Sequence, residues 1–188
     1  MIKTKADLAF YLKEDANVNI NRESCSWFRM KLCLWYGYEH YMAYNYLCAL
    51  RRFEYRLNNK KGKFDLLYVL AKIKYRRLGV KYGFRINPNV VGYGFKIRHI
   101  SCGGGIVGAK KMGNYCSVNG GVVIGIKQNQ DDRATFGDNC TLNVGCKVIG
   151  KINIGNNVTI APNSVVVKDV PDNAIVSGIP AKIIKMKE

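Results

Sequence analysis

Acidic residues, histidines and long apolar runs are all scarce in this chain. The scarcity of acidic residues makes the chain strongly basic, and the lack of long apolar runs bears on membrane segments. Its 13 acidic residues stand against 30 Lys and Arg, which gives a formal net charge of +17. No stretch of eighteen apolar residues occurs, and no apolar segment follows the charged start at residues 1–5. We therefore expect neither a membrane span nor a signal peptide.

Cysteine is present, but it does not form a disulfide framework, because seven residues in a chain of 188 are too few and odd in number. Three of them, Cys116, Cys140 and Cys146, fall at inward positions of the repeat described below. A reduced thiol in such a position acts as a small hydrophobe. We expect a reducing, cytoplasmic setting.

The strongest pattern that is present is a recurrence of large apolar residues at intervals of six, with one position, Gln130, skipped. The occupied positions are Ile106, Met112, Val118, Ile124, Phe136, Leu142, Val148, Ile154, Ile160 and Val166. A period of six fits neither an amphipathic helix nor an alternating strand. In a parallel β-helix, by contrast, each six residues place one apolar side chain in the bore, so we predict this mainly β fold.

The residues between these positions agree with a stack of short coils. Four places after an apolar position stands a residue that can be buried beside it: Cys116, Val122, Cys140, Cys146, Ile152, Val158 and Ser164. Gly and then Asn or Asp often follow the apolar residue directly, as in Met112-Gly-Asn. These types tolerate the left-handed backbone that a corner needs. One coil cannot bury its own face, so we expect stacked coils with capped ends.

Residues 1–85 are predicted to form a helical region that precedes the β-helix of residues 86–188. From about Lys5 to Tyr82 the chain lacks proline and repeats apolar residues at three and four places. We expect one helix around 49–58 and another around 64–78, with Gly79 and then Gly83 ending the helical part. The Tyr-rich stretch 35–46 should pack on the sheet or on a neighbouring subunit, with His40 as a packed residue.

Positive charge is concentrated between Arg51 and Arg85, where twelve Lys and Arg against two acids give +10. Such a surface attracts anions. The plain interpretation is a solvated helical face, and the alternatives are a phosphate-bearing substrate or peripheral contact with a membrane or a lipid-linked acceptor. Nucleic acid is not expected, because no reading motif accompanies the charge.

Two segments of the β-helical region carry residues of chemical interest. His99 stands shortly before three successive glycines, Gly103 to Gly105. Gly103 and Gly108 have the spacing of a P-loop, but no Gly-Lys-Ser/Thr sequence follows, so we reject that interpretation. The glycines more plainly allow a ligand or a neighbouring backbone to approach. The polar, out-of-phase stretch 127–135 predicts a loop that leaves the β-helix.

Together these features resemble the hexapeptide-repeat acyltransferases, specifically the serine acetyltransferase family and its branch found with capsule and exopolysaccharide genes. The resemblance rests on residues 11–15, 74–89, the His99 segment, 163–171 and 178–182. It implies a left-handed parallel β-helix that works as a homotrimer, or as a dimer of trimers, with acetyl-CoA as co-substrate and no metal. A metal-dependent relative, the carbonic anhydrase of this fold, needs three histidine ligands, and only His40 and His99 are present.

The resemblance also assigns roles to individual residues. His99 falls on the catalytic position and would be the general base. The cofactor-binding residues are Lys168, Lys182, Lys185 and Val144, and the acceptor-binding residues are Arg98, Asp131 and Asp132. Cations suit acetyl-CoA because it carries a pyrophosphate and a 3′-phosphate.

Two departures from the serine acetyltransferases bear on the acceptor. Arg98 stands where they have an aspartate before the catalytic histidine, and Asp131-Asp-Arg-Ala134 stands where they have Asp-Arg-His-Pro. We take both to disfavour L-serine, and we predict an acetyl-CoA-dependent O-acetyltransferase acting on a saccharide hydroxyl in a capsular or exopolysaccharide unit or its precursor. The alternative within the enzyme class is L-serine O-acetylation, and the alternative outside it is a non-catalytic β-helix for assembly or binding.

Overall fold

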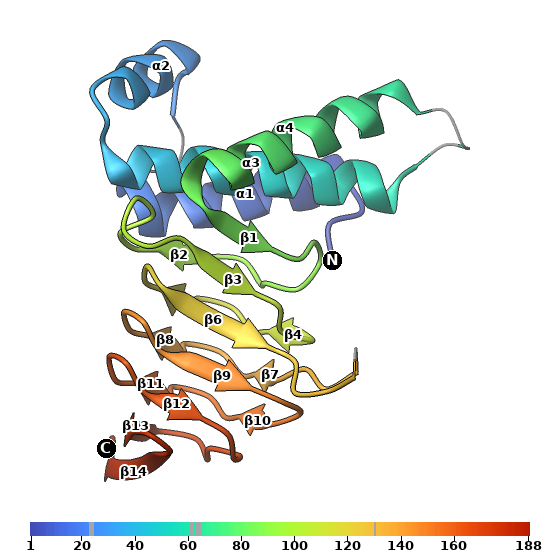
Figure 1. Cartoon of the computed structure of the whole chain (residues 1–188). Helices are drawn as coiled ribbons and strands as arrows, with labels where there is room; N and C mark the ends of the chain where they lie inside the picture. The colour runs from blue at the N-terminus through green and yellow to red at the C-terminus, as the bar shows by residue number, and fades with distance from the viewer. Residues whose placement is uncertain (23–24, 61, 63–64, 130) are drawn as a thin grey trace.

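The computed structural model describes residues 1–22, 25–60, 62, 65–129 and 131–188. Within them, four helices lie at one end of the molecule, and a stack of short strands runs from these helices to the C-terminus (Figure 1). The helices are α1 (Lys5–Ile20), α2 (Trp27–Trp35), α3 (Glu39–Asn58) and α4 (Leu66–Tyr82). No described helix is long and apolar enough to cross a membrane.

The boundaries of α4 follow from local signals. Asp65 caps the helix by accepting a hydrogen bond from the Tyr68 N–H, and Gly83 ends it in the left-handed conformation with φ of +63°.

The prediction that Gly79 ends the helical part is wrong, because Gly79 lies inside α4. A Cβ at this position would lie 2.9 Å from the carbonyl oxygen of Phe84, so the glycine serves the close return of the chain.

The strands form the three faces of a β-helix. They are β1 (Phe84–Ile86), β2 (Lys96–Ile97), β3 (Gly105–Val107), β4 (Lys111–Met112), β5 (Ser117–Val118), β6 (Val122–Gly125), β7 (Thr135–Phe136), β8 (Thr141–Leu142), β9 (Lys147–Ile149), β10 (Asn153–Ile154), β11 (Thr159–Ile160), β12 (Val165–Val166), β13 (Ala174–Gly178) and β14 (Ala181–Met186). The sheet orders are β1-β3-β6-β9-β12, β10-β7-β4 and β14-β13-β11-β8-β5-β2. Within the described residues the strands pair in parallel except β14, which runs antiparallel on β13 and closes the last coil.

The strand register confirms the predicted period of six. Phe136 pairs with Ile154, 18 positions later, so one coil holds three hexapeptides. Met112 pairs with Phe136, 24 positions later, and the six extra residues belong to the predicted loop between β6 and β7. Gln130, the skipped position, lies outside the described residues.

Nine of the ten predicted apolar positions are buried, and Ile106 is the exception. Its side chain is 48% exposed, whereas Val107 is fully buried and pairs with the buried Ile124. The corner between β3 and β4 is one residue shorter than the period requires, since only five positions separate Val107 from Met112. A Cβ on Gly108 would lie 2.7 Å from the carbonyl oxygen of Ile124, so this tight corner needs a glycine.

The coil corners are held by a ladder of Asn and Asp side chains, which we call the corner ladder. Its members, one coil apart, are Asn114, Asp138, Asn156 and Asp172. The carboxylate or amide oxygen of each later member accepts a hydrogen bond from the backbone N–H of the member before it, at 2.7 to 2.9 Å. A glycine precedes each of the first three members, and it is needed because a Cβ there would collide with the side chain of the next member. The left-handed backbone instead falls on Tyr115, Asn139 and Asn157.

A buried ion cluster joins the helices to the first coil. Arg51 of α3 is fully buried, and its guanidinium donates to Asp15 of α1 at 2.8 Å and to Glu54 at 3.1 Å. It also donates to the carbonyl oxygen of Val91 at 2.9 Å, while Asp15 accepts the N–H of Phe95 at 2.9 Å. Burial raises the pKa of both carboxyl groups, and the adjacent guanidinium opposes that rise.

The apolar core continues from the helices into the coils. A single cluster of buried residues includes Tyr46 and Leu50 of α3 together with Phe84 and Ile86 of β1. The division of the chain into domains at residue 85 stays a prediction. Of the Tyr-rich stretch 35–46, Tyr41, Tyr44 and Tyr46 are buried, whereas Trp35, Tyr36 and Tyr38 are exposed.

Candidate active site

His99 follows β2, at the corner between the six-stranded and five-stranded sheets. Its φ of +51° lies in the left-handed region, which residues other than glycine adopt infrequently. Two backbone hydrogen bonds hold the turn: Arg98 N–H donates to Val118 at 2.8 Å, and Cys102 N–H donates to the His99 carbonyl at 2.9 Å. The turn leaves the imidazole side chain 66% exposed.

Glu39, the first residue of α3, is the partner of this imidazole. Its Oε2 lies 3.3 Å from Nδ1 of His99, and its Oε1 accepts a hydrogen bond from the Ser101 hydroxyl. The hydrogen bond from Ser101, and to a smaller extent that from His99, lowers the pKa of Glu39, so the carboxylate is ionised at neutral pH. A carboxylate at Nδ1 selects the tautomer in which Nε2 can accept a proton.

The sequence alone did not point to Glu39. The adjacent His40 was predicted to be a packed residue. It is exposed, although its ring lies 5.7 Å from that of Tyr38 and 4.9 Å from that of Tyr41. Glu39 and His99 are 60 positions apart, and only the docking of α3 on the first coil brings them together. The one available signal is that Glu39 is the sole acid in the Tyr-rich stretch 35–46.

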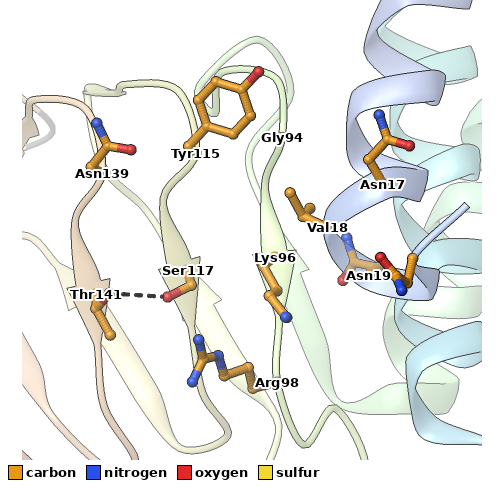
Figure 2. Close-up of a pocket in the computed structure, with 11 residues that line it drawn as sticks. Asn17, Val18, Asn19, Gly94, Lys96, Arg98, Tyr115, Ser117, Asn139 and Thr141 are labelled. Carbon is orange, nitrogen blue, oxygen red and sulfur yellow. Dashed lines mark hydrogen bonds between the residues drawn. The ribbon is translucent and has the colours of Figure 1, made fainter. Parts of the chain in front are cut away.

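A cavity of about 560 Å³ opens beside Arg98, between the end of α1 and the outer face of β2, β5 and β8 (Figure 2). Lys96 and Arg98 both line it, because the intervening Ile97 points into the core. Asn17 and Asn19 of α1 and Ser117 of β5 add polar groups, and none of the described residues that line the cavity is a carboxylate. This lining suits a small molecule that carries an anionic group.

Of the three glycines after His99, Gly104 and Gly105 have a packing role, and Gly103 has a left-handed φ of +82°. A Cβ on Gly104 would collide with the carbonyl oxygen of Gly83, and one on Gly105 would lie 2.6 Å from the Phe84 ring. The Gly105 N–H donates to the Gly83 carbonyl oxygen at 3.0 Å. Close approach of the Gly83 backbone and of the Phe84 ring therefore accounts for Gly104 and Gly105, and the Gly105 N–H already donates a hydrogen bond within the fold.

Of the four residues assigned to the cofactor, the three lysines lie near the C-terminal end of the stack, whereas Val144 lies two coils from His99 at the same corner of the β-helix. Lys182 and Lys185 are exposed on β14, at the opposite edge of the six-stranded sheet from β2. Five strand spacings separate β2 from β14 in this sheet, which corresponds to about 24 Å. Lys168 is exposed after β12, and Val144 is 49% exposed between β8 and β9. Only a long ligand can reach from these cations to the histidine.

Asp131 and Asp132 lie in the loop between β6 and β7, at the corner between the five-stranded and three-stranded sheets. The Asn129 N–H donates to the Asp132 carboxylate at 3.2 Å. This is a different corner from that of His99, so one chain does not bring these acids to the histidine. Across the described part of the chain, no group of three or more His, Cys, Asp and Glu residues could hold a metal ion.

The sequence and the structure of this chain were compared with those of known proteins. No family model matches the chain. The serine acetyltransferase of Synechococcus elongatus is 38% identical over 107 residues, which cover 54% of this chain and 43% of the relative. The serine acetyltransferase of Neisseria gonorrhoeae in complex with serine superposes with a TM-score of 0.73 at 25% identity, over 96% of this chain and 70% of that chain.

The chain is a hexapeptide-repeat β-helix protein that is similar to the serine acetyltransferases. The predicted left-handed β-helix with an N-terminal helical region is confirmed. A serine acetyltransferase of Brucella abortus in complex with coenzyme A has the same fold, with a TM-score of 0.73 at 22% identity over 98% of this chain and 70% of that chain. This β-helix protein spans about half the length of the curated relatives it matches.

The comparison corrects one expectation about this β-helix protein. The relatives named above are serine acetyltransferases, so the predicted saccharide acceptor and the capsule and exopolysaccharide branch are wrong. L-Serine, the alternative, is better supported. The expectation rested on two departures from the serine acetyltransferases, the loop sequence 131–134 and Arg98, and Arg98 was interpreted as the loss of a contact to an ammonium group. Beside Lys96 in the cavity, the same cation suits the carboxylate of an amino acid.

Proposed function

We propose that this chain is an acetyl-CoA-dependent acetyltransferase that acetylates the hydroxyl of L-serine. The observation that carries the proposal is the pairing of His99 with Glu39 next to Arg98, which lines a cation-bearing cavity. Support also comes from the likeness to serine acetyltransferases solved with serine and with coenzyme A.

In this proposal His99 is the general base. Its Nε2 takes the proton from the serine hydroxyl as the oxygen attacks the carbonyl carbon of the acetyl thioester. Glu39 stabilises the imidazolium that results. The imidazolium returns the proton to the departing thiolate, so the products are O-acetyl-L-serine and free coenzyme A.

Lys96 and Arg98 are proposed to bind the carboxylate of L-serine. Both line the cavity, and a guanidinium can hold a carboxylate through two hydrogen bonds. The side-chain amide of Asn17 lies across the same cavity and supplies an oxygen acceptor for the ammonium group (Figure 2). The neighbouring Asn19 is buried, and its amide oxygen already accepts the Ile97 N–H at 3.2 Å.

Acetyl-CoA supplies the acetyl group, and the cations of the C-terminal coils are proposed to bind its phosphates. Lys182 and Lys185 are exposed on β14, and Lys168 and Val144 are exposed on neighbouring coils. The three cations match the negative charge of the acetyl-CoA phosphates, and the spread of the four residues along the coils matches the length of acetyl-CoA.

We propose that the working form is a homotrimer or a dimer of trimers. A single chain leaves Asp131 and Asp132 at a different corner from His99, so these acids meet the histidine only if the loop of one subunit reaches the site of another. Co-expression of a His99→Ala chain with an Asp131→Ala/Asp132→Ala chain tests this. Regained activity in the mixture supports a shared site, and an active monomer in light scattering contradicts it.

The acceptor is tested by measuring thiol release from acetyl-CoA with L-serine, L-alanine and a simple hexose in parallel. We expect turnover with L-serine and none with L-alanine, which has no hydroxyl. The product is identified by mass spectrometry as O-acetyl-L-serine. Equal turnover with the hexose, or none with L-serine, contradicts the proposal.

A further inference from the structure

Helix α4 has two apolar faces, and only one of them is covered by the rest of the molecule. The inner face packs on the core through Tyr68, Ala71, Tyr75, Leu78 and Tyr82. The outer face carries Leu66, Leu70, Ile73 and Val80, which are 69%, 53%, 44% and 86% exposed. Their spacing of four, three and seven residues places them along one side of the helix. We call these four residues the outer stripe.

The charges on α4 are all of one sign. The helix carries five cations and no acid: Lys72, Lys74, Arg76, Arg77 and Lys81. Arg77 lies within the outer stripe, four residues after Ile73 and three before Val80, and Lys74 lies beside it. Exposed aliphatic side chains edged only by cations are typical of a helix that lies in the plane of a membrane surface.

Helix α2 has the same character. Its Trp27, Phe28 and Trp35 are 76%, 71% and 78% exposed, and it contains Arg29 and Lys31 but no acid. Both helices lie at the end of the molecule opposite the C-terminus (Figure 1). Tryptophan is the residue most suited to the boundary between water and lipid, because its ring is apolar and its N–H is polar.

A groove along the flank of α4 adds a place for a lipid headgroup. It has a volume of about 680 Å³ and an apolar floor that includes Phe53, Tyr75 and Phe84. Lys72, Arg76 and Arg85 also line it. A phosphate above an acyl chain matches this pairing of cations with an apolar floor.

Three kinds of partner are compatible with exposed apolar or charged helices, and the charge selects among them. A second copy of this chain would bring five cations of one α4 against five of the other. A nucleic acid would satisfy the cations but leave the outer stripe in water. An anionic lipid surface satisfies both at once, because it offers phosphates to the cations and acyl chains to the stripe.

We propose that the helical end of this protein docks on an anionic membrane surface, with the outer stripe of α4 and the tryptophans of α2 at the lipid boundary. The contact is peripheral, since none of the described helices can span a bilayer. The proposal does not depend on the proposed acetyl transfer.

The test is sedimentation of the full chain with vesicles of phosphatidylcholine alone or with about one third phosphatidylglycerol. We expect binding only to the anionic vesicles. The binding should weaken as the salt concentration rises, because at 0.1 M ionic strength exposed charges are already screened beyond about 10 Å. The chain has two tryptophans, Trp27 and Trp35, so their fluorescence should shift to the blue on binding. No binding to anionic vesicles at low salt overturns the proposal.

Variants separate the contribution of the stripe from that of charge. The Leu70→Gln/Ile73→Gln chain should lose most of its vesicle binding, and Lys74→Gln/Arg77→Gln should weaken binding roughly 10- to 30-fold. Ile184→Gln is the matched control, because Ile184 is 65% exposed on β14 at the far end of the molecule. Unchanged binding by the stripe variant overturns docking through α4. A stripe variant that instead halves the mass in light scattering makes this face a contact between copies and also overturns the proposal.

Discussion

The guanidinium of Arg51 lies 2.8 Å from the carboxylate of Asp15, and neither side chain is exposed to solvent. The contact joins α3 to α1, and both residues also bind the backbone of the first coil, at Val91 and Phe95. The position of α3 on the coils, and with it the position of Glu39 beside His99, therefore depends on this pair.

Removing Arg51 should be strongly destabilising. Arg51→Met leaves Asp15 and Glu54 buried without their cation, and breaking a buried pair in this way costs about 3–5 kcal/mol. The measurement is the free energy of unfolding in urea. Arg52→Met is the matched control, because Arg52 is exposed on the same helix and should change stability by less than about 0.5 kcal/mol. Equal unfolding midpoints for the two variants would contradict the assigned role.

Replacing His99 tests the proposed base. His99→Ala should lower turnover with L-serine by about 10²- to 10⁴-fold and leave the KM for acetyl-CoA nearly unchanged. His40→Ala should keep near-wild-type turnover. Wild-type turnover by His99→Ala, with the assembly intact, would contradict the assignment of His99 as the general base.

Glu39 is expected to act as a positioning residue through the histidine. Glu39→Gln keeps the shape but removes the negative charge that stabilises the imidazolium, so kcat should fall by roughly 10- to 100-fold while the KM for both substrates changes little. Glu39→Asp should recover part of the loss. Thermal unfolding should hardly change, because an exposed pair contributes at most about 1 kcal/mol. A loss confined to KM or to stability would show that Glu39 has another role.

The corner ladder predicts a pH dependence of stability. Hydrogen bonds from the backbone and side chain of Asn156 hold the pKa of Asp172 below its ordinary value of 3.8. The stability they contribute is complete above the pKa of the unfolded chain and is lost as pH falls through the lower pKa of the folded chain. We expect Asp172→Asn to unfold with less pH dependence than the wild type below about pH 4. Asp131→Asn, in the exposed loop, serves as control and should follow the wild type.

The cations on β14 should affect the cofactor alone. Lys182→Ala and Lys185→Ala are each expected to raise the KM for acetyl-CoA by up to about fivefold, as for an exposed ion pair of at most about 1 kcal/mol. The KM for L-serine should not move, and the effect should shrink at high salt. Lys110→Ala, an exposed cation at another corner, is the control. A change in kcat without a change in KM would contradict a role of these lysines in binding acetyl-CoA.

Regular parts of this fold could be predicted from the sequence, and contacts between distant segments could not. Leu142 and Ile160 were predicted to be inward because neighbouring coils impose the same spacing on both. The prediction that Ile106 points inward was wrong, because the periodicity does not report the length of a corner, and the short corner here depends on Gly108. The pairing of Glu39 with His99 depends on how a helix docks, and no local pattern encodes that.

The C-terminal strand β14 has a further effect that concerns aggregation. A stack of parallel coils ends in an open strand edge, whose unpaired N–H and C=O groups can recruit a strand from another chain. By folding back antiparallel on β13, β14 occupies that edge and presents Lys182 and Lys185 outward, where their charges repel an incoming strand. Shortening the chain before Ala181 would therefore expose the β13 edge and favour fibrous self-association, even though the coils above it remained intact.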